Sequence, residues 1–234
     1  MVRAGSAQDL AYGRVPPRVW GSAASQRLDP SELQHLKTLR WRPGQITWLL
    51  DGVGGCFEIA PDAAGVFHTA IEQPGPKHKA LQLAVALPDR AAFKDVIKSA
   101  AMLGAREIHL IYAQRSASHG VRYNEFDLKK AVLWMREVCK QAINPWLPRL
   151  HVHESLMHWL DNYTPADLTH WRLYDPRAHA APVAGTWPLI GPEGGWTDDE
   201  LRLARDRGLH GVQLATPVLT VATATVAALT IAAQ

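Results

Sequence analysis

The chain of 234 residues is long enough to bury one large hydrophobic core or two unequal ones. With 47% hydrophobic and 20% charged residues, its composition is not that of a disordered chain. It has no apolar run of about eighteen residues, so no membrane-spanning helix is expected. Two cysteines, Cys56 and Cys139, exclude a disulfide framework and are expected to be buried thiols. The N-terminus lacks a signal-peptide tract, so a cytoplasmic location is expected. The net charge of +3 is compatible with RNA binding without requiring it.

The first part of the chain predicts a small β domain over residues 1–76, in which residues up to about 25 are irregular. Short runs at 46–50, 56–59 and 66–71 read as strands, and Asp51-Gly52 and Gly65 lie at turns between them. The pattern changes near Gly75-Pro76. We therefore expect a second domain over residues 77–234.

The second part alternates strands with helices, which is typical of a mostly parallel sheet covered on both faces. A strand over 81–87 precedes a helix that Asp89 caps and Gly104 ends, and a strand follows over 107–112. A further helix begins near Leu128 and ends before Asn144. The remaining strands are expected at 150–152, 173–174, 189–190 and 212–214, and the apolar tail 218–233 is expected to be a fully buried helix.

A glycine-rich loop, Gly191 to Trp196, joins one of these strands to a well-defined helix start. Thr197 and Glu200 form a capping box, and Gly208 is placed to end the helix. Gly194-Gly195 permits backbone angles and close approaches that a Cβ would prevent. The loop has neither phosphate-binding glycine pattern, so the two remaining interpretations are a pocket for a neutral or cationic ligand and a tight turn without a ligand.

The segment 189–200, LIGPEGGWTDDE, closely resembles the signature of the bacterial 16S rRNA uridine N3-methyltransferase family, the RsmE branch of the SPOUT methyltransferases. The resemblance extends to residues 81–108, to Arg115-Ser116, to 35–45 (HLKTLRWRPGQ) and to Leu50-Asp51-Gly52. It covers roughly residues 28–234 in motif order.

The resemblance implies an α/β SPOUT fold, with a C-terminal trefoil knot at about 189–225 and a PUA-like β domain before it. It implies S-adenosylmethionine as cofactor, 16S rRNA or a ribosomal subunit as partner, and a homodimer formed through the knot and the C-terminal helix. The implied cofactor-binding residues are Leu189, Ile190, Gly191, Pro192, Glu193, Gly194, Gly195, Leu214, Val218, Leu219, Thr223 and Ala224.

The chain departs from the family pattern where catalysis is expected. Thr220 and Ala222 stand where the family has Arg and Glu, and Lys140 stands in place of an acidic residue. Methylation of uracil N3 needs a base and a partner for the resulting negative charge. Arg115 and Thr220 are the candidate catalytic residues, and Arg115 is also a candidate for substrate binding.

Arg40 and Arg42 are further candidates for substrate binding, with Trp41 and Trp48 beside them, although half-buried strand packing is the stronger interpretation. His151, His153, Glu154 and His158 fit no common zinc spacing, so no metal is expected and these side chains are assigned to surface or cap positions. Three functions remain open: an rRNA methyltransferase, a SPOUT enzyme with another, possibly small-molecule, substrate, and a non-catalytic dimeric RNA-binding protein.

Overall fold

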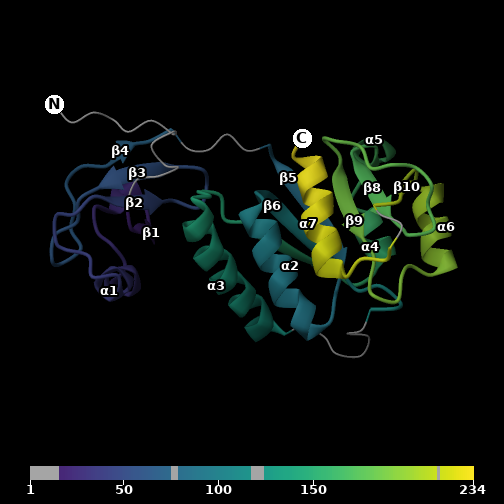
Figure 1. Ribbon diagram of the computed structural model, residues 1–234, viewed down its shortest axis with the longest axis horizontal. Helices are drawn as coiled ribbons and strands as arrows, with labels where there is room; N and C mark the ends of the chain where they lie inside the picture. Colours follow the sequence, from purple (N-terminus) through teal and green to yellow (C-terminus); the bar gives the residue numbers. More distant parts are fainter. Residues whose placement is uncertain (1–15, 75–78, 117–123, 215–216) are drawn as a thin grey trace. The chain divides into compact units, whose positions relative to one another are not determined.

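A computed structural model of the chain describes residues 16–74, 79–116, 124–214 and 217–234 (Figure 1). The chain divides into two compact units. One contains the N-terminal residues through 77 together with Cys139–Leu147, and the other contains His78–Val138 and Pro148–Gln234. The domain break expected at 75–76 falls outside the described residues.

The first unit contains a four-stranded sheet and the helix α1 (Pro30–Thr38). The strands are β1 (Arg18–Trp20), β2 (Thr47–Leu50), β3 (Cys56–Ile59) and β4 (Ile71–Glu72), in the order β1-β2-β3-β4. The β1–β2 pair is parallel, and the other two pairs are antiparallel. The prediction of a strand over 66–71 is wrong. Val66 forms only an isolated bridge with Arg27, and β4 begins at Ile71.

Residues 139–147 join the first unit through specific contacts that the sequence analysis did not foresee. The ammonium group of Lys140 lies 3.1 Å from a carboxylate oxygen of Glu32, whose side chain is buried. The Leu147 amide donates a hydrogen bond to the Gly52 carbonyl (3.0 Å), and the Gly54 amide donates one to Pro145 (3.2 Å). This segment is therefore held by both backbone and side-chain bonds.

The second unit is built on six strands that are parallel throughout. They are β5 (Leu81–Ala86), β6 (Ala105–Ile111), β7 (Arg149–His153), β8 (Trp171–Tyr174), β9 (Trp187–Ile190) and β10 (His210–Val212). Their order is β10-β8-β9-β5-β6-β7. The α/β class with a parallel sheet is thus confirmed, although the last strand ends at residue 212 instead of beginning there.

Helices cover the sheet on both faces, as the alternating pattern predicts. The helices α2 (Arg90–Met102) and α7 (Val221–Ala232) lie side by side across β5, β6 and β9 (Figure 1). The short helices α4 (Leu156–Leu160) and α5 (Pro165–Leu168) contribute with α6 (Asp198–Asp206) to a hydrophobic cluster with the strands. The long helix α3 (Glu125–Ala142) connects β6 to β7. No described helix is long and apolar enough to cross a membrane.

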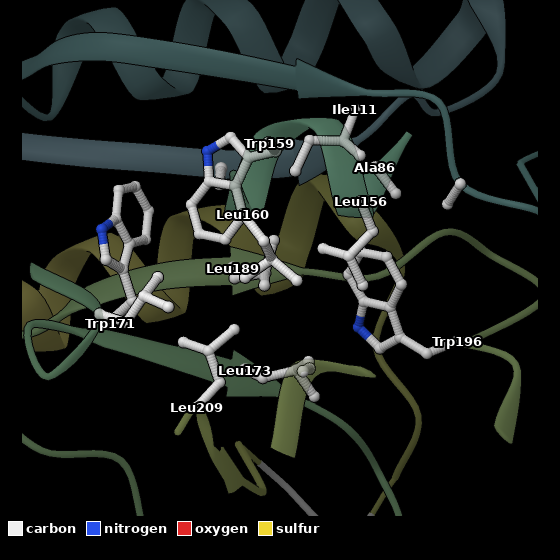
Figure 2. Packing of buried hydrophobic residues seen from close by; sticks show 14 residues of the cluster. Ala86, Ile111, Leu156, Trp159, Leu160, Trp171, Leu173, Leu189, Trp196 and Leu209 are labelled. Atoms are coloured by element: carbon white, nitrogen blue, oxygen red, sulfur yellow. The ribbon is translucent and has the colours of Figure 1, made fainter. Parts of the chain in front are cut away.

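Three tryptophans anchor that cluster. Trp159, Trp171 and Trp196 are each at most 1% exposed and surround the side chain of Leu189 (Figure 2). Burial of such large side chains on one sheet face is a major source of stability. The last of them, Trp196, belongs to the glycine-rich loop, so the core and the loop are packed as one body.

The C-terminal helix α7 is not fully buried, contrary to the sequence expectation. Val221, Thr225 and Leu229 face the interior at helical spacing, whereas Thr223 and Val226 are exposed. An apolar helix therefore presents one of its faces on the surface of the single chain.

Candidate functional site

A pocket of about 440 Å³ lies where several parallel strands of the second unit end. Tyr174 is the last residue of β8 and Asp175 follows it, Gly191 follows β9, and Asp89 precedes α2 after β5. In open α/β sheets, ligands bind outside the carboxyl ends of the strands, where the connecting loops diverge. The position of this pocket is therefore that of a ligand site.

The glycine-rich loop forms one wall, and its glycines have separate roles. Gly195 has a φ of +69°, which disfavours residues with a side chain, and its amide donates to the Pro192 carbonyl at 2.8 Å. Gly194 has no such angle, but a Cβ there would lie 3.0 Å from the Cβ of Arg115. A Cβ on Gly191 would lie 2.8 Å from Nε1 of the buried Trp196 ring. The loop is therefore fixed by one backbone angle and two close approaches.

The predicted capping box holds the far end of the loop. The Thr197 hydroxyl accepts the Glu200 amide at 3.2 Å, and the Glu200 carboxylate accepts the Thr197 amide at 2.9 Å. The second carboxylate oxygen of Glu200 accepts the Gln114 amide at 2.9 Å, a link that sequence spacing could not indicate. The loop after β6 and the start of α6 are thus tied by one buried side chain.

The start of α7 contributes the other wall. Thr220 is the N-cap of this helix, and its hydroxyl accepts the Thr223 amide at 3.3 Å. Thr220, Val221 and Ala224 line the pocket together with residues 217–219. A larger side chain in place of Thr220 would therefore extend into the pocket region, and the N-cap hydrogen bond of α7 would be lost.

The charged side chains that line the pocket itself are acidic. Asp89, Asp175 and Glu193 line it, and no lysine, arginine or histidine does so among the described residues. A Glu193 oxygen accepts the Asp89 amide at 3.3 Å, while the Asp89 carboxylate caps α2 through the Ala92 amide. Burial raises the pKa of Tyr174 to about 12, so its phenol stays protonated and neutral. This apolar, acidic pocket opposes a polyphosphate and suits a cationic ligand.

Most of the residues expected to bind a cofactor do line the pocket. They are Ile190, Gly191, Pro192, Glu193, Gly195, Leu214, Val218, Leu219 and Ala224. The three others lie apart from it: Leu189 is in the core, Gly194 is against Arg115, and Thr223 bonds to Thr220. The sequence analysis missed Tyr174, Asp175 and Trp196 as lining residues. Their places at or after the ends of β8 and β9 were the signal, since strand ends gather at this edge.

The candidate catalytic residues take different positions. Thr220 lines the pocket, whereas Arg115 lies behind the loop, where its Nη1 donates to the Gly194 carbonyl at 3.4 Å. Arg40 and Arg42, in the first unit, are exposed and lie in the turns after α1. The expectation of half-buried strand packing is wrong for both, and only Trp41 between them joins the core.

Of the residues expected at surface or cap positions, Glu154 and His158 are exposed, but His151 and His153 belong to a partly buried cluster with His109. His153 is only 9% exposed, and its Nε2 lies 3.1 Å from Nδ1 of the buried His109. His151 stacks on His109 at a ring distance of 4.8 Å and bonds to Glu107 at 2.6 Å. Among the residues described, no group of three or more such side chains is arranged to hold a metal ion.

Comparisons with known proteins agree on one family. A family model described as an RNA methyltransferase domain matches residues 75–233. A protein of Synechocystis sp. named ribosomal RNA small subunit methyltransferase E is 28% identical over an alignment 224 residues long, which covers 88% of this chain and 72% of that protein.

Two solved structures share the fold over almost the whole chain. A putative methyltransferase from Legionella pneumophila, in complex with S-adenosylmethionine, has a TM-score of 0.76 at 20% identity over 93% of this chain and 96% of that one. A ribosomal RNA small subunit methyltransferase E from Neisseria gonorrhoeae, bound to S-adenosylmethionine, has a TM-score of 0.75 at 19% identity over 92% and 96%. Since the family model covers well over half of its residues, the chain belongs to the RNA methyltransferase family.

Proposed function

We propose that this protein binds S-adenosylmethionine in the pocket between the glycine-rich loop and the start of α7, and transfers its methyl group to ribosomal RNA. The observation that carries the proposal is the composition of the pocket wall. Apolar residues and three carboxylates line the pocket with no basic residue among those described, so a ligand with a sulfonium cation fits there. The relatives from Legionella pneumophila and Neisseria gonorrhoeae, both described as bound to this molecule, support the assignment.

The residues present suit this cofactor. An added Cβ would clash with a neighbouring residue at Gly191 and Gly194, and a side chain would be strained at Gly195. The loop therefore has three positions without side chains, at which a ligand can contact the backbone. Ile190, Leu219 and Val221 provide apolar surface for an adenine ring. When bound, S-adenosylmethionine supplies an electrophilic methyl group. Glu193 offers negative charge to the cation, whereas the charge of Asp175 is already paired with Arg177.

The proposed acceptor is uridine N3 of 16S rRNA, which the family resemblance implies. Removing that proton requires a base, and the resulting anion requires a donor or cation nearby. Thr220 offers a hydroxyl at the pocket, and Arg115 offers a guanidinium at the loop. A hydroxyl and a protonated guanidinium do not accept a proton readily, and Tyr174 remains protonated. Among the described lining residues the carboxylates of Asp89, Asp175 and Glu193 can accept one, and we assign the base to none of them in particular. A small-molecule acceptor and a non-catalytic RNA-binding role are not favoured by family membership.

Contacts to the RNA are proposed for exposed cations. Arg40 and Arg42 are exposed on the first unit, and Arg40 has a φ of +57°, an uncommon angle for a residue with a side chain. Trp41 is 8% exposed and donates to the Gln45 carbonyl, so it is not available for base stacking. Phosphate contacts by Arg40 and Arg42 would make binding weaken steeply with salt.

The remaining family features belong to the same proposal. A trefoil knot at about 189–225 is supported by the pocket, which brings residues 190–196 and 217–224 together. A PUA-like role is proposed for the first unit, whose described residues form a small sheet, the helix α1 and a short 3-10 helix, Ala23–Ser25. A homodimer through the knot and α7 is supported by the uncharged exposed face of that helix. A ribosomal substrate would place the protein in the cytoplasm.

The test has two steps. Calorimetry with S-adenosylmethionine should give saturable binding to the unmutated protein at one site per chain. Radiolabelled methyl transfer should then be measured on purified small ribosomal subunits and on free 16S rRNA, with mapping of the modified base. Absence of binding at millimolar cofactor would overturn the proposal, and binding without transfer to either RNA would move it toward the other two functions.

A further inference from the structure

Arg177 makes four hydrogen bonds around the pocket without lining it. Its backbone amide and its Nε donate to Oδ1 of Asp175, at 3.0 and 3.2 Å. Its Nη1 donates to Oδ1 of Asp198 at 3.0 Å, and its Nη2 donates to the Trp196 carbonyl at 3.0 Å. One guanidinium therefore connects three separate points of the chain.

Two of those points are walls of the pocket. Asp175 follows β8, and Trp196 ends the glycine-rich loop that follows β9. The third point, Asp198, is the first residue of α6. Arg177 thus fixes the distance between the end of β8 and the loop, on which the width of the pocket depends.

The chemistry of the bond set requires an arginine. Three donors of a planar guanidinium reach three acceptors in fixed directions, whereas a lysine ammonium acts as a point charge on a flexible stem. The side chain of Asp175 is only 10% exposed, and a buried carboxylate in a pocket wall is costly without a partner. Arg177 provides that partner while keeping its own side chain half-exposed.

We infer that Arg177 is a positioning residue of this pocket, which holds the glycine-rich loop against the end of β8 in the shape that binds S-adenosylmethionine. The inference rests on the proposed function. It assigns a role in cofactor affinity to a residue that touches no cofactor, acting through Asp175 and the Trp196 carbonyl.

The chain offers a matched control for its test. Arg202 pairs with Asp199 at 2.8 Å, and Asp199 is the neighbour of Asp198 in the first turn of α6. Both aspartates are highly exposed, at 84% and 76% of the side chain, and neither lines the pocket. Removing the Arg202–Asp199 pair therefore takes an exposed ion pair and its charges from the first turn of α6, but leaves the loop alone.

The experiment measures the dissociation constant of S-adenosylmethionine by calorimetry in full-length variants. Arg177→Met should weaken binding about tenfold, since charged hydrogen bonds to the loop are lost, and Arg202→Met should not. Arg177→Lys should stay closer to Arg177→Met than to the unmutated protein. Asp198→Asn should weaken binding more than Asp199→Asn does.

A double-mutant cycle separates positioning from general stability. Asp198→Asn should have little further effect on affinity in the Arg177→Met background, because the two residues act through one bond, while the Arg202 and Asp199 changes should leave affinity unaltered singly and together. Thermal midpoints should shift similarly for Asp198→Asn and Asp199→Asn, whereas Arg177→Met should lower the midpoint further, because the buried carboxylate of Asp175 loses its partner.

The outcomes are distinguishable. Binding that Arg177→Met and Asp198→Asn leave unchanged would overturn the inference alone, and the proposed function would stand. No binding by the unmutated chain would overturn both. If Arg177→Met fails to fold, the comparison of Asp198→Asn with Asp199→Asn decides, because both replacements lie on the surface.

Discussion

Glycine is needed at three positions of the glycine-rich loop, for two different physical reasons. Gly195 adopts a positive φ, whereas at Gly191 and Gly194 an added Cβ would lie too close to a neighbouring side chain. A run of glycines in a sequence predicts a tight loop, but it does not tell these reasons apart. The difference matters for substitution, since a close approach can be tested with alanine alone.

We expect Gly194→Ala to weaken S-adenosylmethionine binding severalfold. The added Cβ would lie 3.0 Å from the Arg115 Cβ and 3.2 Å from the Arg115 carbonyl oxygen, so the loop has to move away. Calorimetry checks this, with Gly211→Ala as control, because a Cβ there meets the Ala178 Cβ at an ordinary 3.5 Å. Equal affinities in the two variants would contradict the expectation.

At position 220 the structure sharpens a prediction about activity. We expect Thr220→Arg with Ala222→Glu to raise methyl transfer to 16S rRNA, because a cation near the developing uracil anion contributes about 2.7–4 kcal/mol in comparable sites. The two changes are introduced together, so that neither charge is left without a partner.

The same change removes the cap of α7, which has its own expected effect. Thr220→Ala should lower the free energy of unfolding by about 1 kcal/mol without adding a charge, so it serves as the control. Activity should be measured by initial rates on small subunits, relative to that control. A double variant that folds, binds cofactor and is no faster than Thr220→Ala would exclude a catalytic effect of this pair.

At the level of elements, β6 and β7 carry a histidine pair whose titration should affect stability. Burial lowers the pKa of His109 to about 3 and that of His153 to about 4, with the neighbouring imidazoles adding to both shifts. Both imidazoles are thus neutral in the folded protein, while the unfolded chain takes up protons below about pH 6.5. The free energy of unfolding should fall as the pH drops from about 6.5 to 4, by up to about 1.4 kcal/mol per pH unit for each group.

Urea unfolding at several pH values measures this dependence. His109→Gln should flatten the curve between about pH 6.5 and 4, because it removes one of the two titrating groups. His170→Gln is the control, since His170 is exposed and lies against Trp187 outside the pair. If the free energy of unfolding depends on pH as steeply in His109→Gln as in His170→Gln, the lowered pKa of His109 is contradicted.

Elements were the most predictable level of the fold. The parallel strands, the caps at Asp89 and Thr197 and the helix end at Gly208 follow from local patterns and are confirmed. Contacts between distant segments were not predictable. The link from Glu200 to Gln114 and the histidine pair between strands depend on register, which one sequence does not contain.

The candidate site was predicted in part for the same reason. The glycine-rich loop is a continuous motif, so residues such as Ile190 and Glu193 could be assigned from it. Asp175 and Arg177 belong to a different loop, without a motif of their own, and only the sheet order brings them to the pocket. The buried position of His153 was missed because alternation along a short edge strand is a weak signal.

For the whole molecule, α7 leads to a prediction about assembly. Its twelve residues carry no charge, and Val226 on its outer face is 41% exposed. We expect a homodimer in sedimentation experiments, with Val226→Glu shifting it toward a monomer near the chain mass of 25.8 kDa. Val132→Glu on α3, where the side chain is 37% exposed, should leave the dimer intact. A stable monomer of the unmutated protein would exclude the interface.

Residues 139–147 belong to the N-terminal unit, so the protein cannot be divided into its two units by a single cut in the chain. α3 runs from Glu125 to Ala142, so the last turn of one continuous helix is assigned to a different unit from the rest of it. A catalytic fragment cut after residue 77 would carry Lys140 without Glu32 and Trp146 without the turn at Gly54. Recombination that exchanges the N-terminal unit for another therefore has to carry residues 139–147 along with it, although β5, α2, β6 and most of α3 lie between the two segments in the sequence.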